Sequence, residues 1–312
     1  MTNPPVLFIV GPTASGKTDA AIALAQRFNG EVVNADSRQV YRGMSIGTAK
    51  PDATQQALAP HHLIDVVAAD EAWSLARFLT TARETIAAIH GRGRLPIVVG
   101  GTGQYIWGLV EGWRVPEVPP QKGLRAELEE EAAAVGGDAL HQRLASIDPA
   151  AASAIDPRNV RRTIRALEVW EVTGERFSAQ RDKREPPFLA LMFGFDVPRA
   201  ELHQRIVARI DAMVAQGWVD EVQRLLESGS TPDLPSFSSA GYREMAAHIV
   251  GDLTLEQAKD RTRVATNRLA RSQAGWFRRT DPRIAWAANQ DILSEAVAAA
   301  LSACMSGCAS GT

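Results

Sequence analysis

The sequence predicts an α/β protein in which helices flank a parallel sheet and an all-helical insertion interrupts the sheet-forming core. Three observations support this fold class. An apolar run near the amino terminus leads into a glycine-rich loop, and a helical segment follows the loop. Further apolar runs alternate with segments of helical periodicity, which is the pattern of parallel sheets. A stretch bounded by prolines then carries helical periodicity with no strand-like run between its helices.

The first strand is predicted at Val6–Val10, where five apolar residues run into the loop. The loop has the P-loop spacing G-x-x-x-x-G-K-[ST] and consists of Gly11, Pro12, Thr13, Ala14, Ser15, Gly16, Lys17 and Thr18. Its glycines let the backbone wrap a phosphate, and N–H groups at the start of the helix predicted over Asp19–Phe28 point at the anion. Lys17 adds a positive charge, and the Thr18 hydroxyl is a ligand for Mg²⁺. The loop therefore predicts a bound di- or triphosphate without specifying which one.

The rest of the first part, residues 1–115, continues the alternation of strands and helices. We expect strands at Glu31–Asp36, Leu63–Val67 and Leu95–Val99, and helices at Leu75–His90 and after Gly103. The functional loops of a parallel sheet lie at the carboxyl ends of its strands. Because Gly11–Thr18, Asp36–Gln39 and Gly100–Gly103 follow three such ends, they can converge on one crevice.

The insertion is predicted over residues 116–185, between two proline-rich boundaries. Its expected helices are Gln121–Val135, Asp138–Ile147 and Asn159–Thr173. The core resumes over residues 186–312. There we expect strands at Phe188–Val197 and, at an edge, Ile284–Ala287, helices at Arg199–Gln216, Trp218–Ser228, Leu255–Arg279 and Asp291–Leu301, and a frayed tail over Ser302–Thr312.

Composition is ordinary for a globular protein, with 45% hydrophobic and 22% charged residues and a net charge of −2. Cys304 and Cys308 lack neighbours at metal-ligand spacing, so no zinc site is expected. No apolar run reaches the ~18 residues of a transmembrane span, and Met1–Pro5 is too short for a signal peptide. We expect a cytoplasmic monomer with no membrane partner.

The simplest function for such a loop is that of an ATPase or a small-molecule kinase. Against it, the buried strand Leu95–Val99 ends in Gly-Gly-Thr, where an acidic residue that holds Mg²⁺ would be expected. Asp36 is then the strand-end carboxylate beside the loop, and it is either a metal ligand or a general base. The structural alternatives are that Asp36 caps its own loop and that Thr102 completes a tight turn.

Arginine clusters favour a polyanionic partner although the net charge is near zero. Arg158, Arg161, Arg162 and Arg165 fall within two helical turns of the insertion, and further cations recur along Leu255–Arg279. The alternative is a solvated helix face, with Glu168 and Glu171 as partners of Arg165. Arg205 and Arg209 share a face of the next helix, where one of them can reach a phosphate or can pair with Glu201 or Asp211.

Seven stretches together resemble the bacterial tRNA dimethylallyltransferases, which are also called tRNA isopentenyltransferases. They are GPTASGKT (11–18), NADSRQVYRGMSIGTAKP (34–51), VVGGTGQYI (98–106), RRTIRALEVWEVTG (161–174), LHQRIVARIDAMVAQG (202–217), AGYREM (240–245) and RLARSQAGWFRR (268–279). They cover nearly the whole chain in the family's order. The resemblance implies a P-loop core with a helical insertion, and prenylation of the adenine immediately 3′ of the anticodon.

The resemblance also implies roles for individual residues. Thr13–Thr18 would bind the diphosphate of dimethylallyl diphosphate, and Arg209 would join them. Asp36 would be the general base, and Thr102 would line the site near the adenine. From the residues themselves, Gly11, Pro12 and Arg205 are further candidates for binding the diphosphate, and Mg²⁺ is the expected cofactor at Thr18. The residues implied to hold tRNA are Asp36, Ser37, Arg38, Gln39, Thr102, Arg125, Arg161, Arg162, Thr163, Ile164, Arg165, Ser238, Gly241, Tyr242, Arg243, Arg271, Gln273, Trp276 and Arg278. The chain departs from the family at Ser272 and Gly275, where one positive charge is missing and the helix is weakened. A small-molecule kinase and an RNA-binding NTPase are the alternative functions.

Overall fold

The computed structural model describes residues 3–180 and 183–309. The chain divides into two compact units. The first unit comprises Met1–Ser74, Phe78–Val110 and Pro187–Thr312, and the second comprises Leu75–Arg77 and Glu111–Pro186. Each unit has its own hydrophobic core.

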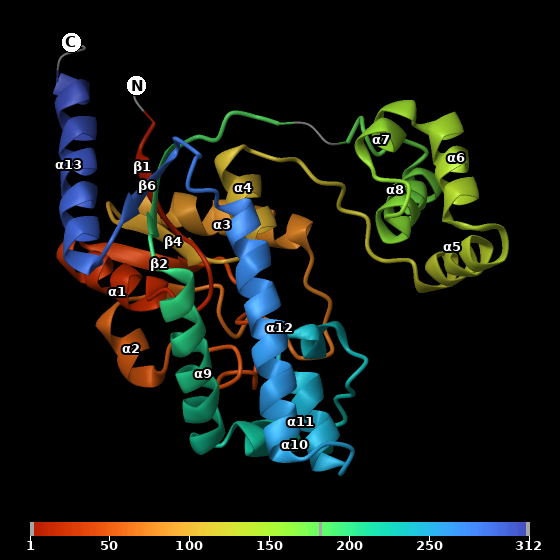
Figure 1. Ribbon diagram of the computed structural model, residues 1–312. Helices are drawn as coiled ribbons and strands as arrows, with labels where there is room; N and C mark the ends of the chain where they lie inside the picture. Colours follow the sequence, from red (N-terminus) through yellow and green to blue (C-terminus); the bar gives the residue numbers. More distant parts are fainter. Residues whose placement is uncertain (1–2, 181–182, 310–312) are drawn as a thin grey trace. The chain divides into compact units, whose positions relative to one another are not determined.

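The first unit is built on a six-stranded sheet in which every pair of neighbouring strands is parallel (Figure 1). The strands are β1 (Pro5–Val10), β2 (Gly30–Asn34), β3 (His61–His62), β4 (Leu95–Gly100), β5 (Leu189–Phe195) and β6 (Ile284–Ala287). Their order across the sheet is β3-β2-β4-β1-β5-β6. The predicted α/β class with a parallel sheet and flanking helices is therefore confirmed, and β6 lies at an edge as expected.

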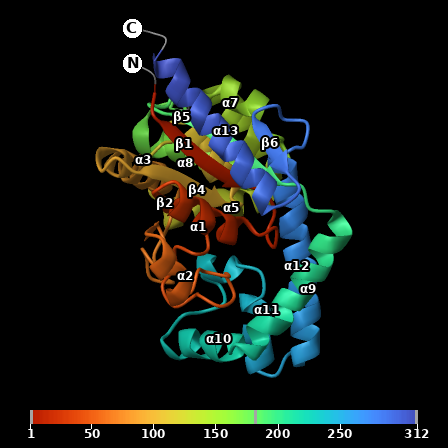
Figure 2. The same ribbon diagram turned by 90° about the vertical axis from the view of Figure 1, so that its left-hand side faces the viewer.

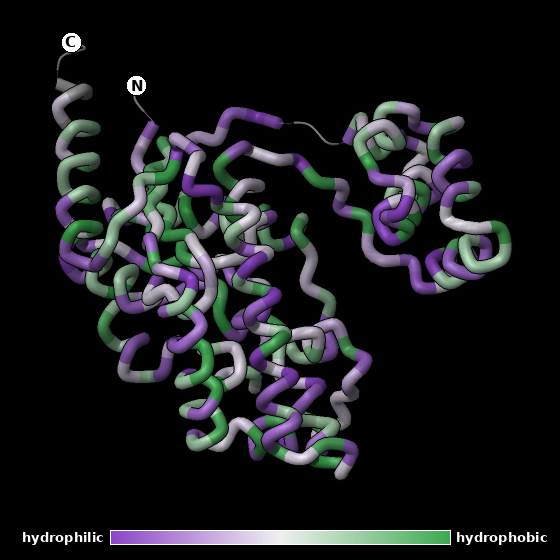
Figure 3. Tube along the Cα trace, in the orientation of Figure 1, coloured by the Kyte–Doolittle hydropathy of each residue, from purple (hydrophilic) through white to green (hydrophobic). Residues whose placement is uncertain are grey.

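Helices cover both faces of this sheet (Figure 2). On one face, Leu7 and Ile9 of β1 share a core with Leu24 of α1 (Lys17–Arg27) and Leu293 of α13 (Gln290–Ala309). The other first-unit helices are α2 (Ala53–Leu58), α3 (Leu75–Gly91), α4 (Gly103–Val110), α9 (Arg199–Ala215), α10 (Trp218–Glu227), α11 (Tyr242–Ile249) and α12 (Leu255–Trp276), with a 3₁₀ turn at Pro235–Ser238. In Figure 3 much of α12 is coloured as hydrophilic.

Three expected elements have different bounds. The short strand is at His61–His62 and not at Leu63–Val67, because Leu63 and Asp65 have φ values of +61° and +54°, which no strand accommodates. The long helix ends at Trp276, since Phe277 leaves helical geometry (φ −108°, ψ 82°) with its ring buried. The last helix continues to Ala309, beyond the expected end at Leu301 and into the segment for which a frayed tail is predicted. Residues 310–312 lie outside the described part.

The second unit is helical, with α5 (Lys122–Val135), α6 (Gly137–Ile147), α7 (Pro149–Ala154) and α8 (Val160–Thr173). Its core contains Leu128, Leu140, Leu144, Ile164 and Leu167. The helix α7 was not anticipated, and neither were α2 and α11, which are all short. Among the described residues, no helix has the length and apolar character needed to cross a lipid bilayer.

Candidate active site

The P-loop follows β1 and ends in the first turn of α1, as the spacing predicts. Ala14 and Gly16 have φ values of +63° and +92°, so the backbone turns sharply before Lys17, where the helix begins. Thr13–Thr18 line a cavity of about 560 Å³, whereas Gly11 and Pro12 are not among its lining residues. The N–H groups at the start of α1 lie at this cavity, which suits an anion.

The carboxyl ends of β1, β2 and β4 meet at the same cavity. Asp36, two residues after β2, lines it together with Gly100 and Gly101 after β4. The close approach requires glycine, because a Cβ on Gly100 would lie 2.2 Å from the carbonyl oxygen of Ala35. The hydroxyl of Thr102 accepts a hydrogen bond from the Ser37 N–H at 3.1 Å. The expected convergence of three strand-end loops is therefore confirmed.

Asp36 is held by its own loop. Its carboxylate accepts a hydrogen bond from the Arg38 N–H at 2.8 Å, and the Asn34 side chain binds the N–H and C=O of Asp36. This is the loop-capping geometry considered as the structural alternative. It uses a single lone pair of one carboxylate oxygen, so the carboxylate keeps acceptor capacity toward the cavity it lines.

Lys17 is the cation inside the loop. Burial lowers the pKa of its ammonium to about 7, an effect that Asp36 opposes and Arg209 increases. The ammonium donates to the carbonyl oxygen of Pro12. A bound diphosphate would supply negative charge here and restore the charged form of Lys17.

Arg205 and Arg209, one turn apart on α9, differ in what they reach. The half-buried Arg209 lines the P-loop cavity, and burial lowers the pKa of its guanidinium while Asp19 opposes that shift. Arg205 is exposed and pairs with Glu201 at 2.5 Å. Of the two, Arg209 is therefore the one that lines the cavity, whereas Arg205 has the surface ion pair that was its alternative and also donates to the carbonyl oxygen of Ala14 in the P-loop at 3.5 Å.

Gln273 lies at the P-loop cavity although the resemblance implied that it holds tRNA. The side chain is buried, and its amide oxygen accepts a hydrogen bond from the Thr13 N–H at 2.8 Å. A Cβ on Gly101 would lie 2.1 Å from the amide nitrogen. Gln273 thus joins α12 to two of the three convergent loops.

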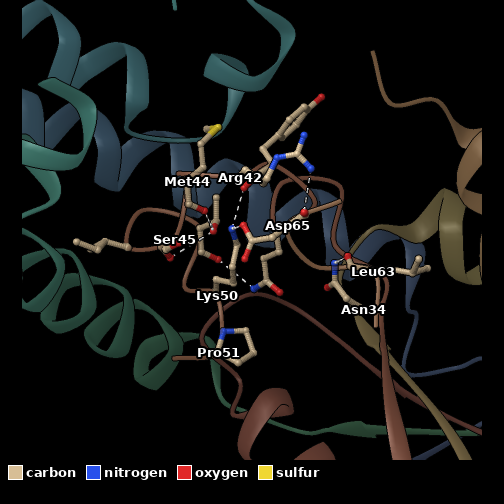
Figure 4. Close-up of polar contacts among 12 residues, drawn as sticks. Asn34, Arg42, Met44, Ser45, Lys50, Pro51, Leu63 and Asp65 are labelled. Atoms are coloured by element: carbon tan, nitrogen blue, oxygen red, sulfur yellow. Dashed lines mark hydrogen bonds and ion pairs between the residues drawn. The ribbon is translucent and has the colours of Figure 1, made fainter. Parts of the chain in front are cut away.

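A polar network fixes the irregular segment between β2 and β3 (Figure 4). The side chain of Lys50, buried and lining the cavity, donates to the carbonyl oxygen of Tyr41 at 2.8 Å and pairs with Asp65. The Gln39 amide donates to the carbonyl oxygens of Thr48 and Ala49. Gln39, implied to touch tRNA, therefore also holds one wall of the cavity.

The other residues implied to hold tRNA differ in exposure. The first unit presents Ser238, Arg243, Arg271, Trp276 and Arg278 at its surface. Arg38 donates to the carbonyl oxygen of Pro235, so it ties its loop to the turn before Ser238. Tyr242 is fully buried, and Gly241 packs so closely on Trp218 that a Cβ would lie 2.0 Å from the ring. Gly241 and Tyr242 therefore shape this surface from beneath.

In the second unit, the arginines have two kinds of surroundings. Arg125 and Arg165 both pair with the buried carboxylate of Glu168, at 2.7 and 2.5 Å, and these contacts lower the pKa of Glu168 against the effect of burial. Arg161 and Arg162 are exposed. Thr163 and Ile164, which lie between Arg162 and Arg165 in the sequence, are buried, and Ile164 belongs to the core of this unit. The ion-pair alternative thus describes Arg165 through Glu168, whereas Glu171 pairs with Arg143. Within residues 3–180 and 183–309, no ion pair is seen for the exposed Arg161 and Arg162.

Glu221 of α10 is among the buried carboxylates that sequence reasoning missed. It accepts hydrogen bonds from the loop after Met44 and from the Tyr242 hydroxyl. A single glutamate on an amphipathic helix normally indicates solvent exposure, so the sequence offered no signal beyond its position on the Trp218 face.

The fold and the site together define an α/β P-loop protein with a cavity built for a di- or triphosphate beside a strand-end aspartate. The chain belongs to the IPP transferase family. The family model described as "IPP transferase" matches residues 39–280, and that described as "Isopentenyl transferase" matches residues 4–65.

Relatives and solved structures agree with this assignment. The tRNA dimethylallyltransferase of Roseiflexus sp. (strain RS-1) is 53% identical, covering 88% of this chain and 90% of the relative, and that of Thermomicrobium roseum is 50% identical, covering 88% and 84%. The full-length tRNA isopentenylpyrophosphate transferase of Bacillus halodurans has a TM-score of 0.66 at 41% identity, covering 92% and 90%. A eukaryotic dimethylallyltransferase whose structures describe it acting on tRNA has a TM-score of 0.76 at 30% identity, covering 89% and 70%.

Proposed function

We propose that this protein transfers the dimethylallyl group of dimethylallyl diphosphate to the N6 amine of the adenosine immediately 3′ of the anticodon in tRNA, releasing diphosphate. The observation that carries the proposal is the make-up of one cavity. It combines the P-loop, the Asp36 carboxylate and an apolar wall of Ile46, Ile64 and Met213. A diphosphate, a proton acceptor and a site for a short hydrocarbon are what this transfer needs.

The leaving group is the first chemical problem. An adenine amine is a poor nucleophile because its lone pair is delocalised into the ring, so the allylic carbon must be made reactive. Lys17, Arg209 and the loop N–H groups stabilise the negative charge that develops as the C–O bond to diphosphate breaks. The carbon bonded to that oxygen then gains positive charge, and the nitrogen forms the new C–N bond.

The proton is the second problem. As the C–N bond forms, N6 loses one proton, and Asp36 accepts it. We expect Mg²⁺ as cofactor, and Thr18, which lines the cavity, would hold it through its hydroxyl beside a bound diphosphate. The metal would add charge stabilisation on the departing diphosphate.

The RNA must present an unstacked adenine, since the reacting amine is inaccessible in a stacked base. The exposed cations of both units, including Arg161, Arg162, Arg243 and Arg271, are suited to RNA phosphates. We expect a cytoplasmic monomer, since tRNA is the acceptor and a single chain supplies the P-loop, Asp36 and the apolar residues of the cavity.

Incubation with labelled dimethylallyl diphosphate and unmodified tRNA, followed by nucleoside analysis, tests the proposal. We expect label in N6-dimethylallyladenosine and release of one diphosphate per transfer. Thermal unfolding separates the kinase and NTPase alternatives. Dimethylallyl diphosphate should raise the melting temperature more than ATP does, and ATP hydrolysis without prenyl transfer would overturn the proposal.

A further inference from the structure

The buried carboxylate of Glu221 grips the loop that forms one wall of the P-loop cavity. One oxygen accepts hydrogen bonds from the N–H groups of Ser45 and Ile46, both at 2.8 Å. The other accepts from the Gly47 N–H at 3.3 Å and from the Tyr242 hydroxyl at 2.7 Å. Glu221 is only 5% exposed, so three consecutive backbone donors are paired with one buried side chain.

Tyr242 contributes a hydroxyl that stays protonated and donates a hydrogen bond to the Glu221 carboxylate. Burial and the adjacent carboxylate raise the pKa of the Tyr242 phenol, so the hydroxyl remains a donor to Glu221. Its ring packs edge-on against Trp218, with centroids 5.8 Å apart. A Cβ on Gly47 would lie 2.1 Å from the Trp218 ring nitrogen, so the loop backbone rests directly on this aromatic base.

The loop held by Glu221 provides part of the apolar wall of the cavity. Ile46 and Ala49 line the cavity; Ile46 is one of the three residues whose N–H groups bind Glu221, and Ala49 lies two residues after the last of them. Met213 of α9 and Ile64 also line it. By contrast, Lys17 and Arg209, the cations proposed to bind the diphosphate, make none of the described hydrogen bonds to this loop.

We propose that Glu221 and Tyr242 are positioning residues for the hydrocarbon group of the donor, acting through the loop Ser45–Ala49. This inference rests on the proposed function and deepens it. The carboxylate fixes the distance between the apolar wall and the phosphate cradle, which determines how well a five-carbon group is held next to Asp36. The diphosphate itself is bound by other residues.

Because Glu221 is proposed to act on the hydrocarbon group and not on the diphosphate, comparing the binding of dimethylallyl diphosphate with that of inorganic diphosphate gives a direct test. Glu221→Gln replaces one acceptor oxygen with an NH₂ group that faces backbone donors, so the loop must shift. Titration calorimetry without tRNA should show that this variant binds dimethylallyl diphosphate about tenfold more weakly and inorganic diphosphate within about twofold of wild type. Tyr242→Phe, which removes only the hydroxyl, should shift the same ratio by a smaller factor.

Glu227→Gln is the matched control, because Glu227 is exposed on the same helix and contacts Gln223. It should bind both ligands as wild type does. The inference is overturned when Glu221→Gln keeps the wild-type preference for dimethylallyl diphosphate over diphosphate, or loses affinity for both equally. If Glu221→Gln does not fold, the same comparison of the two affinities is made with Tyr242→Phe, and an unchanged preference for dimethylallyl diphosphate would overturn the inference. If wild type itself fails to prefer dimethylallyl diphosphate, the proposed function fails first.

Discussion

The amide oxygen of Gln273 accepts a hydrogen bond at 2.8 Å from the backbone N–H of Thr13, joining α12 to the P-loop across 260 residues of sequence. The nitrogen of the same side-chain amide lies against Gly101, which follows β4. The helix α12 thus takes part in shaping the P-loop cavity. If a diphosphate binds there, as proposed, a change at Gln273 should alter its affinity.

Gln273→Glu should weaken binding of diphosphate by tenfold or more. A carboxylate in this buried position would place negative charge directly beside the anion and would lack the donor that faces Gly101. Gln273→Ala removes the hydrogen bond without adding charge and should cost about 1 kcal/mol of binding free energy. Calorimetric titration with diphosphate measures both. Equal effects of the two variants would contradict an electrostatic contact at this residue.

Lys17 should take up a proton when diphosphate binds near neutral pH. Its pKa of about 7 in the free protein means that a substantial fraction is neutral there, whereas the bound anion favours the charged form. Below pH 7 Lys17 is already charged, so the uptake should vanish as pH falls and grow as pH rises above 7. Calorimetry in two buffers with different ionisation enthalpies gives the number of protons.

Lys17→Arg is the control for this titration, because a guanidinium stays charged throughout the range. The difference in proton uptake between wild type and this variant removes the contribution of the ligand's own phosphate groups. A difference of zero at pH 8 would show that Lys17 is already fully charged in the free protein.

Asp36→Asn should leave tRNA binding almost unchanged and lower turnover by 10²-fold or more. Asparagine retains the side-chain oxygen that accepts the Arg38 N–H, so the loop geometry is preserved. What disappears is the capacity to accept the proton from N6. Single-turnover prenylation measures the chemical step, and filter binding measures tRNA affinity. Wild-type turnover in this variant would remove Asp36 from the proton transfer.

The cradle was predictable from the sequence, because a P-loop is a local pattern whose residues are adjacent in the chain. The convergence of Asp36 and of Gly100 and Gly101 on it was predictable too, since it follows from the rule for parallel strand ends, whereas Thr102 is not among the residues that line the cavity and bonds to the Ser37 N–H instead. The helical content of the insertion followed from periodicity in the same way. These inferences need only the order of elements.

What the sequence could not predict depends on distant packing. Gln273 belonged to a stretch associated with tRNA, and only the folded chain shows it bonded to Thr13. The partner of Arg165 was foreseen because Glu168 is three residues away, but the pairing of Arg125 with the same carboxylate spans 43 residues. For Glu221 the sequence offered only its position on the Trp218 face, because the backbone donors that pair with it lie about 175 residues away and the Tyr242 hydroxyl lies 21 residues away.

Substitution of the exposed arginines and of the ion-paired Arg165 in the second unit should have different effects, the first on tRNA binding and the second on stability. Arg161 and Arg162 are exposed, so the double substitution to alanine should weaken tRNA binding. Because two phosphate contacts are lost, the slope of log K against log salt should become smaller by about 1.5. Arg165→Ala instead leaves the buried Glu168 with one partner fewer, at a cost of up to ~3 kcal/mol of unfolding free energy. Its salt slope should stay near that of wild type. Denaturant unfolding and salt-dependent filter binding measure the two quantities. A reversed pattern, with Arg165→Ala changing the slope and the double variant changing only stability, would assign the RNA contact to the ion-paired arginine.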